Sequence, residues 1–294
     1  MDNDKMVAKA VATLLSAKGR SSKAEDWVEL QRLAKLTALR VGNGGEFYVS
    51  NFWRGPLLYT LVLDRKPKHV LEIGTGRGYG ALSMARAAVD GGLDTTVWTV
   101  DERPSRQQQP WAIDEGDGPR VEDLSVEDVW ERHVPNEVRE RVCAITGDSR
   151  SVLSRWLRTG RPAVDLVFID GGHDYWTVKH DFLATLRVAN LGVVLLFDDY
   201  GERVRYGVKR LIDREVAPKI PPGALVVIDT GAEDSRPDSA KPEHKMVLLT
   251  TNPDQEPGEA FYSKMHQAAF MAVYPFTMTV GRGLLRAYRS IRKR

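Results

Sequence analysis

The chain has 294 residues, 42% hydrophobic composition and a formal net charge of +2, which is typical of a soluble globular protein with one large domain and extensions. The net charge is too small to indicate nucleic acid as the main partner, because phosphate binding needs concentrated basic surface. The single cysteine, Cys143, excludes an intrachain disulfide and a multi-cysteine zinc site, and fits a cytoplasmic location.

The N-terminal segment predicts helices. Residues 4–17 and 24–40 carry apolar side chains at helical spacing, and residues 55–63 predict another helix that ends before Pro67. Two early aspartates stand where a secretory signal needs positive charge, so we do not expect this segment to be a secretory signal. We expect residues 1–63 to form a helical cap.

Short β-rich runs alternate with amphipathic helices through residues 64–252, the expected main domain. The predicted strands are 69–73, 96–101, 141–146, 164–170, 192–199, 224–230 and 245–251. Several of these runs are apolar on both faces, which indicates a mostly parallel sheet covered by helices on both sides. The expected fold class is therefore α/β, with a doubly wound, seven-stranded sheet and helical extensions at both ends.

Two segments fall outside this alternation. Residues 102–120 are irregular and too long for an ordinary connector, which predicts a functional lid; a solvated insertion is the alternative. Residues 253–294 predict a helical basic tail, and its last part, 281–294, has six basic residues and no acidic one. That part is expected to pack on this chain or on a second copy in a homodimer, with peripheral membrane contact as the alternative. The apolar run 268–280 is too short to span a membrane.

A glycine-rich sequence, VLEIGTGRGYG, follows the first strand of the predicted sheet and opens a helix. Its glycines are Gly74, Gly76 and Gly78. A dinucleotide fingerprint would need a further glycine where Tyr79 stands. The pattern Gly-x-Gly-x-Gly preceded by Glu72 instead resembles motif I of the class I S-adenosylmethionine-dependent methyltransferases. The Rossmann-like fold of that superfamily agrees with the predicted sheet.

The resemblance implies a cofactor site. Asp101 ends the second strand, where the superfamily has an acid that binds the ribose hydroxyls. Asp148 matches the acid that meets the adenine amino group, and the glycine loop wraps the amino-acid end of the cofactor. The residues expected to bind S-adenosylmethionine are Glu72, Gly74, Thr75, Gly76, Gly78, Asp101, Asp148 and Ser149. A structural role is the alternative for Glu72.

Carboxylates end two of the predicted strands. VDLVFID ends in Asp170, and VVLLFDDY contains the adjacent Asp198 and Asp199. If these strands are neighbours in a parallel sheet, the three side chains converge at its carboxyl edge. Converging carboxylates repel one another unless they are protonated or neutralised, and oxygen ligands suit Mg²⁺ or a similar divalent cation.

This arrangement resembles the metal-dependent O-methyltransferases of the catechol type. The sequences LVFIDGGHDY, LLFDDYG and GVKRLIDRE are most similar to the macrocin-type sugar and polyketide O-methyltransferases, over about residues 69–216. The resemblance implies that Asp170, Asp198 and Asp199 bind the metal and that His173 is the catalytic base. Alternatively, Asp199 is the base and His173 has a structural place at the helix entry.

The expected function is divalent-metal-assisted methyl transfer from S-adenosylmethionine to a hydroxyl group of a sugar or small natural product. Asp170 and His173 are the expected catalytic residues. A metal-independent N- or C-methyltransferase, a hydroxylase-like enzyme and a non-catalytic member of the same fold are the alternatives.

Overall fold

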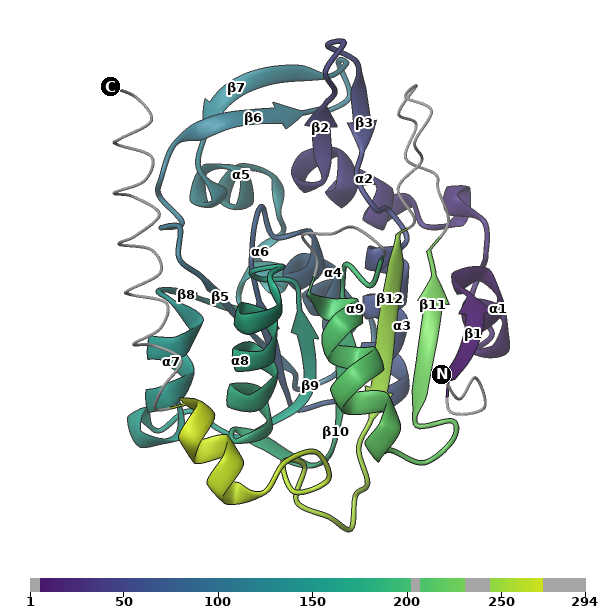
Figure 1. The fold of residues 1–294 in the computed structure, drawn as a ribbon. Coiled ribbons are helices and arrows are strands. Elements are labelled where there is room, and N and C mark those ends of the chain that lie inside the picture. Colours follow the sequence, from purple (N-terminus) through teal and green to yellow (C-terminus); the bar gives the residue numbers. More distant parts are fainter. Residues whose placement is uncertain (1–5, 202–206, 231–243, 272–294) are drawn as a thin grey trace, which may run out of the picture.

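The computed structural model describes residues 6–201, 207–230 and 244–271 (Figure 1). The basic segment 281–294 lies outside the described residues. Within the described part of the chain, no helix has the length and apolarity needed to cross a membrane.

A mostly parallel sheet forms the centre of the molecule. Its eight strands lie in the order β1-β11-β12-β10-β9-β4-β5-β8, and only β12 runs antiparallel to its neighbours. The strands are β1 (Met6–Ala10), β4 (His69–Ile73), β5 (Thr96–Asp101), β8 (Val142–Thr146), β9 (Val164–Ile169), β10 (Ala189–Phe197), β11 (Leu225–Asp229) and β12 (Lys245–Thr250). The predicted fold class is confirmed, and all seven predicted strands are present.

Strand β1 is the eighth strand and corrects the predicted helix over 4–17. Residues 6–10 pair in parallel with β11 at the edge of the sheet, and helix α1 (Val11–Ala17) begins only afterwards. Met6 and Ala10, the two apolar positions at helical spacing in this short run, fit a helix and a strand equally well. The pairing partner, more than 200 residues away, decides in favour of a strand.

Helices cover both faces of the sheet, because side chains of the central strands alternate between two cores. In β9, Leu166 and Phe168 pack in one core, whereas Val167 and Ile169 pack in the other. The first core is closed by α2 (Val28–Thr37), α3 (Arg54–Arg65), α4 (Tyr79–Asp90), α5 (Val126–His133) and α6 (Asn136–Arg139). The second is closed by α7 (Ser149–Arg155), α8 (Tyr175–Leu186) and α9 (Val208–Leu211). Helix α3 runs through the expected boundary at residue 63, so the cap and the sheet share the first core.

Two hairpins lie at one end of the molecule (Figure 1). They are β2–β3 (Leu39–Val41 and Phe47–Val49) and β6–β7 (Gln109–Ile113 and Arg120–Leu124). The second hairpin includes residues 109–120, so a strand and a turn lie where only irregular chain was predicted, whereas residues 102–108 contain no helix or strand. Pro110 argued against a strand at this position, because proline is tolerated only at the edge of a sheet. Trp111 is fully buried, and its indole N–H donates to the Leu36 carbonyl over 2.7 Å.

Candidate active site

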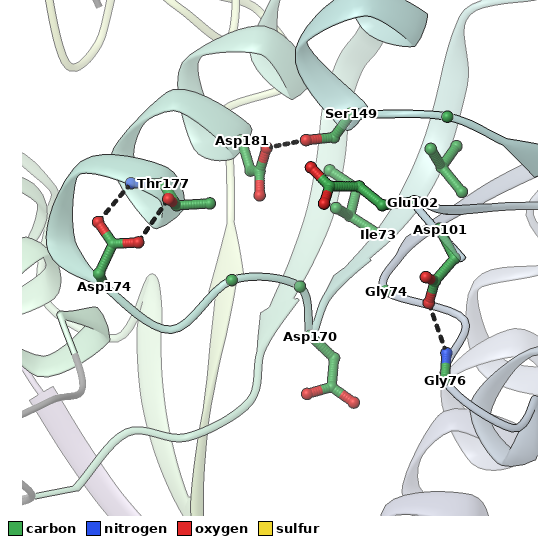
Figure 2. Close-up of a pocket in the computed structure, with 14 residues that line it drawn as sticks. Ile73, Gly74, Gly76, Asp101, Glu102, Ser149, Asp170, Asp174, Thr177 and Asp181 are labelled. Carbon is green, nitrogen blue, oxygen red and sulfur yellow. Dashed lines mark hydrogen bonds between the residues drawn. The ribbon is translucent and has the colours of Figure 1, made fainter. Parts of the chain in front are cut away.

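A cavity of about 360 Å³ opens at the carboxyl ends of β4, β5, β8 and β9 (Figure 2). This is the edge at which open α/β sheets bind ligands. The residues that line it are Ile73, Gly74, Gly76, Val100, Asp101, Glu102, Gly147, Ser149, Asp170, Gly171, Gly172, Asp174, Thr177 and Asp181. Gly74, Gly76, Asp101, Ser149 and Asp170 are the predicted site residues among them.

The glycine turn brings β4 against the end of β9. Gly74 has φ +94°, and a Cβ there would lie 2.1 Å from the carbonyl oxygen of Asp170. Gly78 also has φ +94°, but its Cβ would overlap Trp130 of α5 instead of reaching the cavity. Glycine is therefore required at both positions for close approach of backbone and side chain.

Asp101 is anchored beside this turn. Its Oδ2 accepts a hydrogen bond from the Gly76 N–H (2.9 Å), and its Oδ1 accepts one from the Arg103 N–H (2.8 Å) (Figure 2). These bonds fix a carboxylate on the cavity wall at the end of β5, which is where a ribose-binding acid was predicted.

Glu72 and Thr75 support the turn without lining the cavity. Glu72 is 1% exposed, and its carboxyl group accepts a hydrogen bond from Thr99 Oγ1 (2.5 Å), which also lies 2.5 Å from Thr75 Oγ1. Burial raises the pKa of Glu72 to about 8. A Cβ at Gly80 would lie 2.2 Å from the Glu72 carboxylate, so helix α4 packs directly on this group.

Arg77, within the glycine sequence, ties the turn to both hairpins. It donates to the Leu39 carbonyl and to the Pro110 carbonyl, each over 2.9 Å. Its guanidinium also lies 4.8 Å from the centre of the Trp111 ring. Arg77 therefore links the glycine turn to the segment that was predicted to be a lid.

Asp148 and Ser149 are adjacent at the start of α7, but only Ser149 lines the cavity. Asp148 caps the helix by accepting from the Arg150 N–H (2.9 Å) and pairs with the Arg150 side chain, and it does not line the cavity. Ser149 does line it, and its hydroxyl donates to Asp181 Oδ1 over 2.7 Å (Figure 2). Sequence reasoning missed Asp181, which lies in the middle of helix α8.

The three acids predicted to bind a metal, Asp170, Asp198 and Asp199, lie close together as expected. The guanidinium of Arg54 lies among them, which was not predicted. Arg54 Nη1 lies 2.6 Å from Asp170 Oδ2 and 3.1 Å from Asp198 Oδ2. Burial raises the pKa of both aspartates, against the opposing effect of the Arg54 charge. Although burial lowers the pKa of Arg54, the carboxylates raise it overall. The one sequence signal was a basic residue in the otherwise apolar run FWRGPLL.

His173 and Asp199 form a second pair beside the first. Nδ1 of His173 lies 2.7 Å from Asp199 Oδ2, and the His173 side chain is 45% exposed. The hydrogen bond to Asp199 raises the pKa of His173. Asp199 has φ +58°, and its N–H donates to Asp198 Oδ1 over 2.9 Å. Asp174 is the N-cap of α8 and accepts from the Trp176 and Thr177 N–H groups.

The described residues can accommodate a divalent cation. Donor atoms of Asp170, His173 and Asp199 all lie within 4.8 Å of one another. That separation is about twice a metal–ligand distance of 2.0–2.4 Å, so one ion could contact all three. Arg54 contacts both Asp170 and Asp198, so this contact does not separate the two as ligands. Asp198 stays a predicted ligand beside the residues whose donor atoms converge.

The cavity is strongly acidic. Asp101, Glu102, Asp170, Asp174 and Asp181 contribute carboxyl groups, and none of the fourteen described residues that line it is basic. Such a lining attracts a cationic ligand and disfavours a phosphate.

The chain is similar to proteins described as methyltransferases. Residues 71–200 match the model of a family described as a methyltransferase domain. Comparison with curated proteins finds no match. The O-methyltransferase TomG from Streptomyces achromogenes, in complex with S-adenosylmethionine, is a similar solved structure: the identity is 19%, the match covers 82% of this chain and 96% of that chain, and the TM-score is 0.50. The O-methyltransferase from Bacillus cereus, in complex with S-adenosylhomocysteine, also has 19% identity, with 82% and 97% of the chains covered and a TM-score of 0.49.

Proposed function

We propose that this chain, whose residues 71–200 match the model of a methyltransferase domain, transfers the methyl group of S-adenosylmethionine to a hydroxyl group of a small molecule. The observation that carries the proposal is the acidic cavity beside the glycine turn, with the acid and histidine cluster at one side of it.

The cavity suits the charge of this methyl donor. S-adenosylmethionine carries a sulfonium, an ammonium and one carboxylate group but no phosphate, so its net charge is positive and an acidic cavity favours it over a dinucleotide. The bare backbone at Gly74 and Gly76 leaves room for its amino-acid end, and the Asp101 carboxylate is available to the ribose hydroxyls.

The acid and histidine cluster supplies the acceptor chemistry. The hydroxyl oxygen attacks the methyl carbon as the carbon–sulfur bond breaks, which yields the methyl ether, S-adenosylhomocysteine and a proton. A neutral hydroxyl is a weak nucleophile, so a base must take that proton. His173 is the proposed base, and the Asp199 carboxylate orients its imidazole through Nδ1.

Asp170 and Asp199 are the proposed carboxylate ligands of a divalent cation. When bound, such a cation lowers the pKa of the acceptor hydroxyl and fixes its position. Arg54 holds Asp170 and Asp198 in place and balances part of their charge. The proposed acceptor class is a sugar or another natural product, which the involvement of TomG in tomaymycin synthesis supports.

Calorimetry tests the donor and the cation in turn. S-adenosylhomocysteine is titrated into chelator-treated protein, followed by Mg²⁺, for the wild type, Asp170→Ala and Asp174→Asn. We expect saturable ligand binding in all three and Mg²⁺ binding that only Asp170→Ala loses. Asp174→Asn is the matched control, because it removes a carboxylate from the same cavity while asparagine still caps α8.

Methyl transfer to a panel of hydroxylated sugars and polyketides then tests the acceptor. His173→Ala should lose turnover and keep ligand affinity. Absence of S-adenosylhomocysteine binding in the wild type would contradict the proposed function. Ligand binding and turnover that persist without Mg²⁺ binding would favour a metal-independent methyltransferase, in which the Arg54 guanidinium balances the charge of the acids.

A further inference from the structure

Ser149, Glu102 and Asp181 line one end of the cavity, and the proposed reaction assigns no role to them. Figure 2 shows the Ser149 and Asp181 pair across the cavity from Asp170. Because the transferred methyl group must lie beside Asp170 and His173, and Asp101 is available to the ribose, the purine of the ligand must extend toward Ser149. This step rests on the proposed function.

The hydrogen bond between Ser149 and Asp181 fixes the direction of a hydroxyl group. A serine hydroxyl has one proton and two lone pairs, and it ordinarily rotates to suit its partner. Here the proton is committed to Asp181 Oδ1, 2.7 Å away. Ser149 Oγ therefore faces the cavity only as a hydrogen-bond acceptor. The neighbouring Glu102 carboxylate is also an acceptor.

The burial and hydrogen bonding of Asp181 indicate a functional role, because they do not stabilise the fold. It is 1% exposed, and its Oδ2 has no hydrogen-bond partner among the described residues. His180 Nδ1 lies 3.5 Å from Oδ1, and a Cβ at Gly171 would lie 3.4 Å from Oδ2. A buried carboxylate oxygen without a partner destabilises the folded state, so such groups are uncommon without a function.

We infer that Asp181 is a positioning residue that holds Ser149 as a hydrogen-bond acceptor and thereby makes this end of the cavity selective for a purine with an exocyclic amino group. Adenine offers two N–H donors at that position. A purine with only hydrogen at carbon 6 offers none, and it leaves the Ser149 lone pairs without a partner.

The test compares two ligands, S-adenosylhomocysteine and its analogue with hydrogen in place of the 6-amino group. Dissociation constants are measured by calorimetry for the wild type, Asp181→Leu and Asp181→Asn. In the wild type we expect the analogue to bind about five- to tenfold more weakly, the value of one hydrogen bond. Asp181→Leu should reduce the ratio to about two or less, because the Ser149 hydroxyl is free to rotate. Asp181→Asn should keep it, because the amide oxygen still accepts from Ser149.

Ser149→Ala provides an independent variant if Asp181→Leu does not fold. It should also abolish the discrimination, and the double variant should be no worse than either single one, since both act through one bond. Asp181→Leu or Ser149→Ala with an unchanged ratio would overturn the inference, as would a wild type that binds both ligands equally. A wild type that binds neither ligand would instead contradict the proposed function.

Discussion

Arg54 places a permanent positive charge among carboxylates that would otherwise repel one another. Its side chain is 15% exposed, and one of its nitrogens contacts both Asp170 and Asp198. The contact comes from the first turn of α3, whereas the acids follow β9 and β10. Part of the neutralisation that a divalent cation would provide is thus built into the chain.

Replacing Arg54 by methionine should destabilise the protein by about 3 kcal/mol in chelator, because it leaves buried carboxylates without their partner. Saturating Mg²⁺ should recover part of the loss by binding only the folded state. Urea denaturation with and without Mg²⁺ measures both effects. Arg106→Met is the control, since its pairing with Glu127 is exposed and should leave the urea midpoint close to that of the wild type. Equal urea midpoints for Arg54→Met and the wild type would contradict the role assigned to Arg54.

Glu72 should make the stability of the protein depend on pH. Its pKa is about 8 in the folded chain and near 4.5 when unfolded, so the folded state binds more protons between these values. The free energy of unfolding therefore falls as the pH rises from 5 to 8, by at most about 1.4 kcal/mol per pH unit for this group. Glu72→Gln should unfold with a flatter pH dependence over that range and match the wild type most closely near pH 5. Parallel curves for the two proteins would show that Glu72 does not titrate in this range.

Local sequence predicted the acids and the histidine of the site but not their partners on helices. Asp170, Asp198 and Asp199 follow apolar strands, and the edge of a parallel sheet brings such positions together. Arg54 and Asp181 lie on helices, and only the packing of those helices on the sheet decides what they face. The residues next to Arg54 and Asp181 in the sequence do not predict that packing.

At the scale of elements, the two hairpins hold the glycine turn in place. Both contact Arg77 through backbone carbonyls, and Trp111 packs under its guanidinium. The strands of the central sheet were predictable because their apolar runs are long and regularly spaced. The hairpin β6–β7 was not, because its strand pairing is short and contains Pro110.

Trp111→Ala should cost about 3–5 kcal/mol of folding stability, because it empties a fully buried site. It should also weaken S-adenosylhomocysteine binding, since Arg77 loses its support. Val121→Ala, in the same hairpin but 50% exposed, should change stability by less than about 0.5 kcal/mol. Thermal melting and calorimetry measure the two effects. Unchanged ligand affinity in a folded Trp111→Ala protein would indicate that the hairpin is independent of the glycine turn.

At the scale of the whole molecule, the acidic cavity should select ligands by charge. S-adenosylhomocysteine at about 100 times its dissociation constant should stabilise the protein by about 2.7 kcal/mol. NAD⁺ at the same concentration should produce no shift in melting temperature, because its phosphates meet carboxylates and no basic side chain among the described residues that line the cavity. Comparable stabilisation by NAD⁺ would contradict the electrostatic argument.

Strand β1 gives the sheet a particular order of assembly on the ribosome. Met6 pairs with Leu225, so β1 is synthesised more than 200 residues before its partner strand. At ordinary elongation rates of about 5–20 residues per second, β1 must wait roughly 10–45 s for β11 to be made. During that interval β4, β5, β8, β9 and β10 can pair among themselves, whereas β1 has no partner in the sheet until β12 and β11 extend it beyond β10.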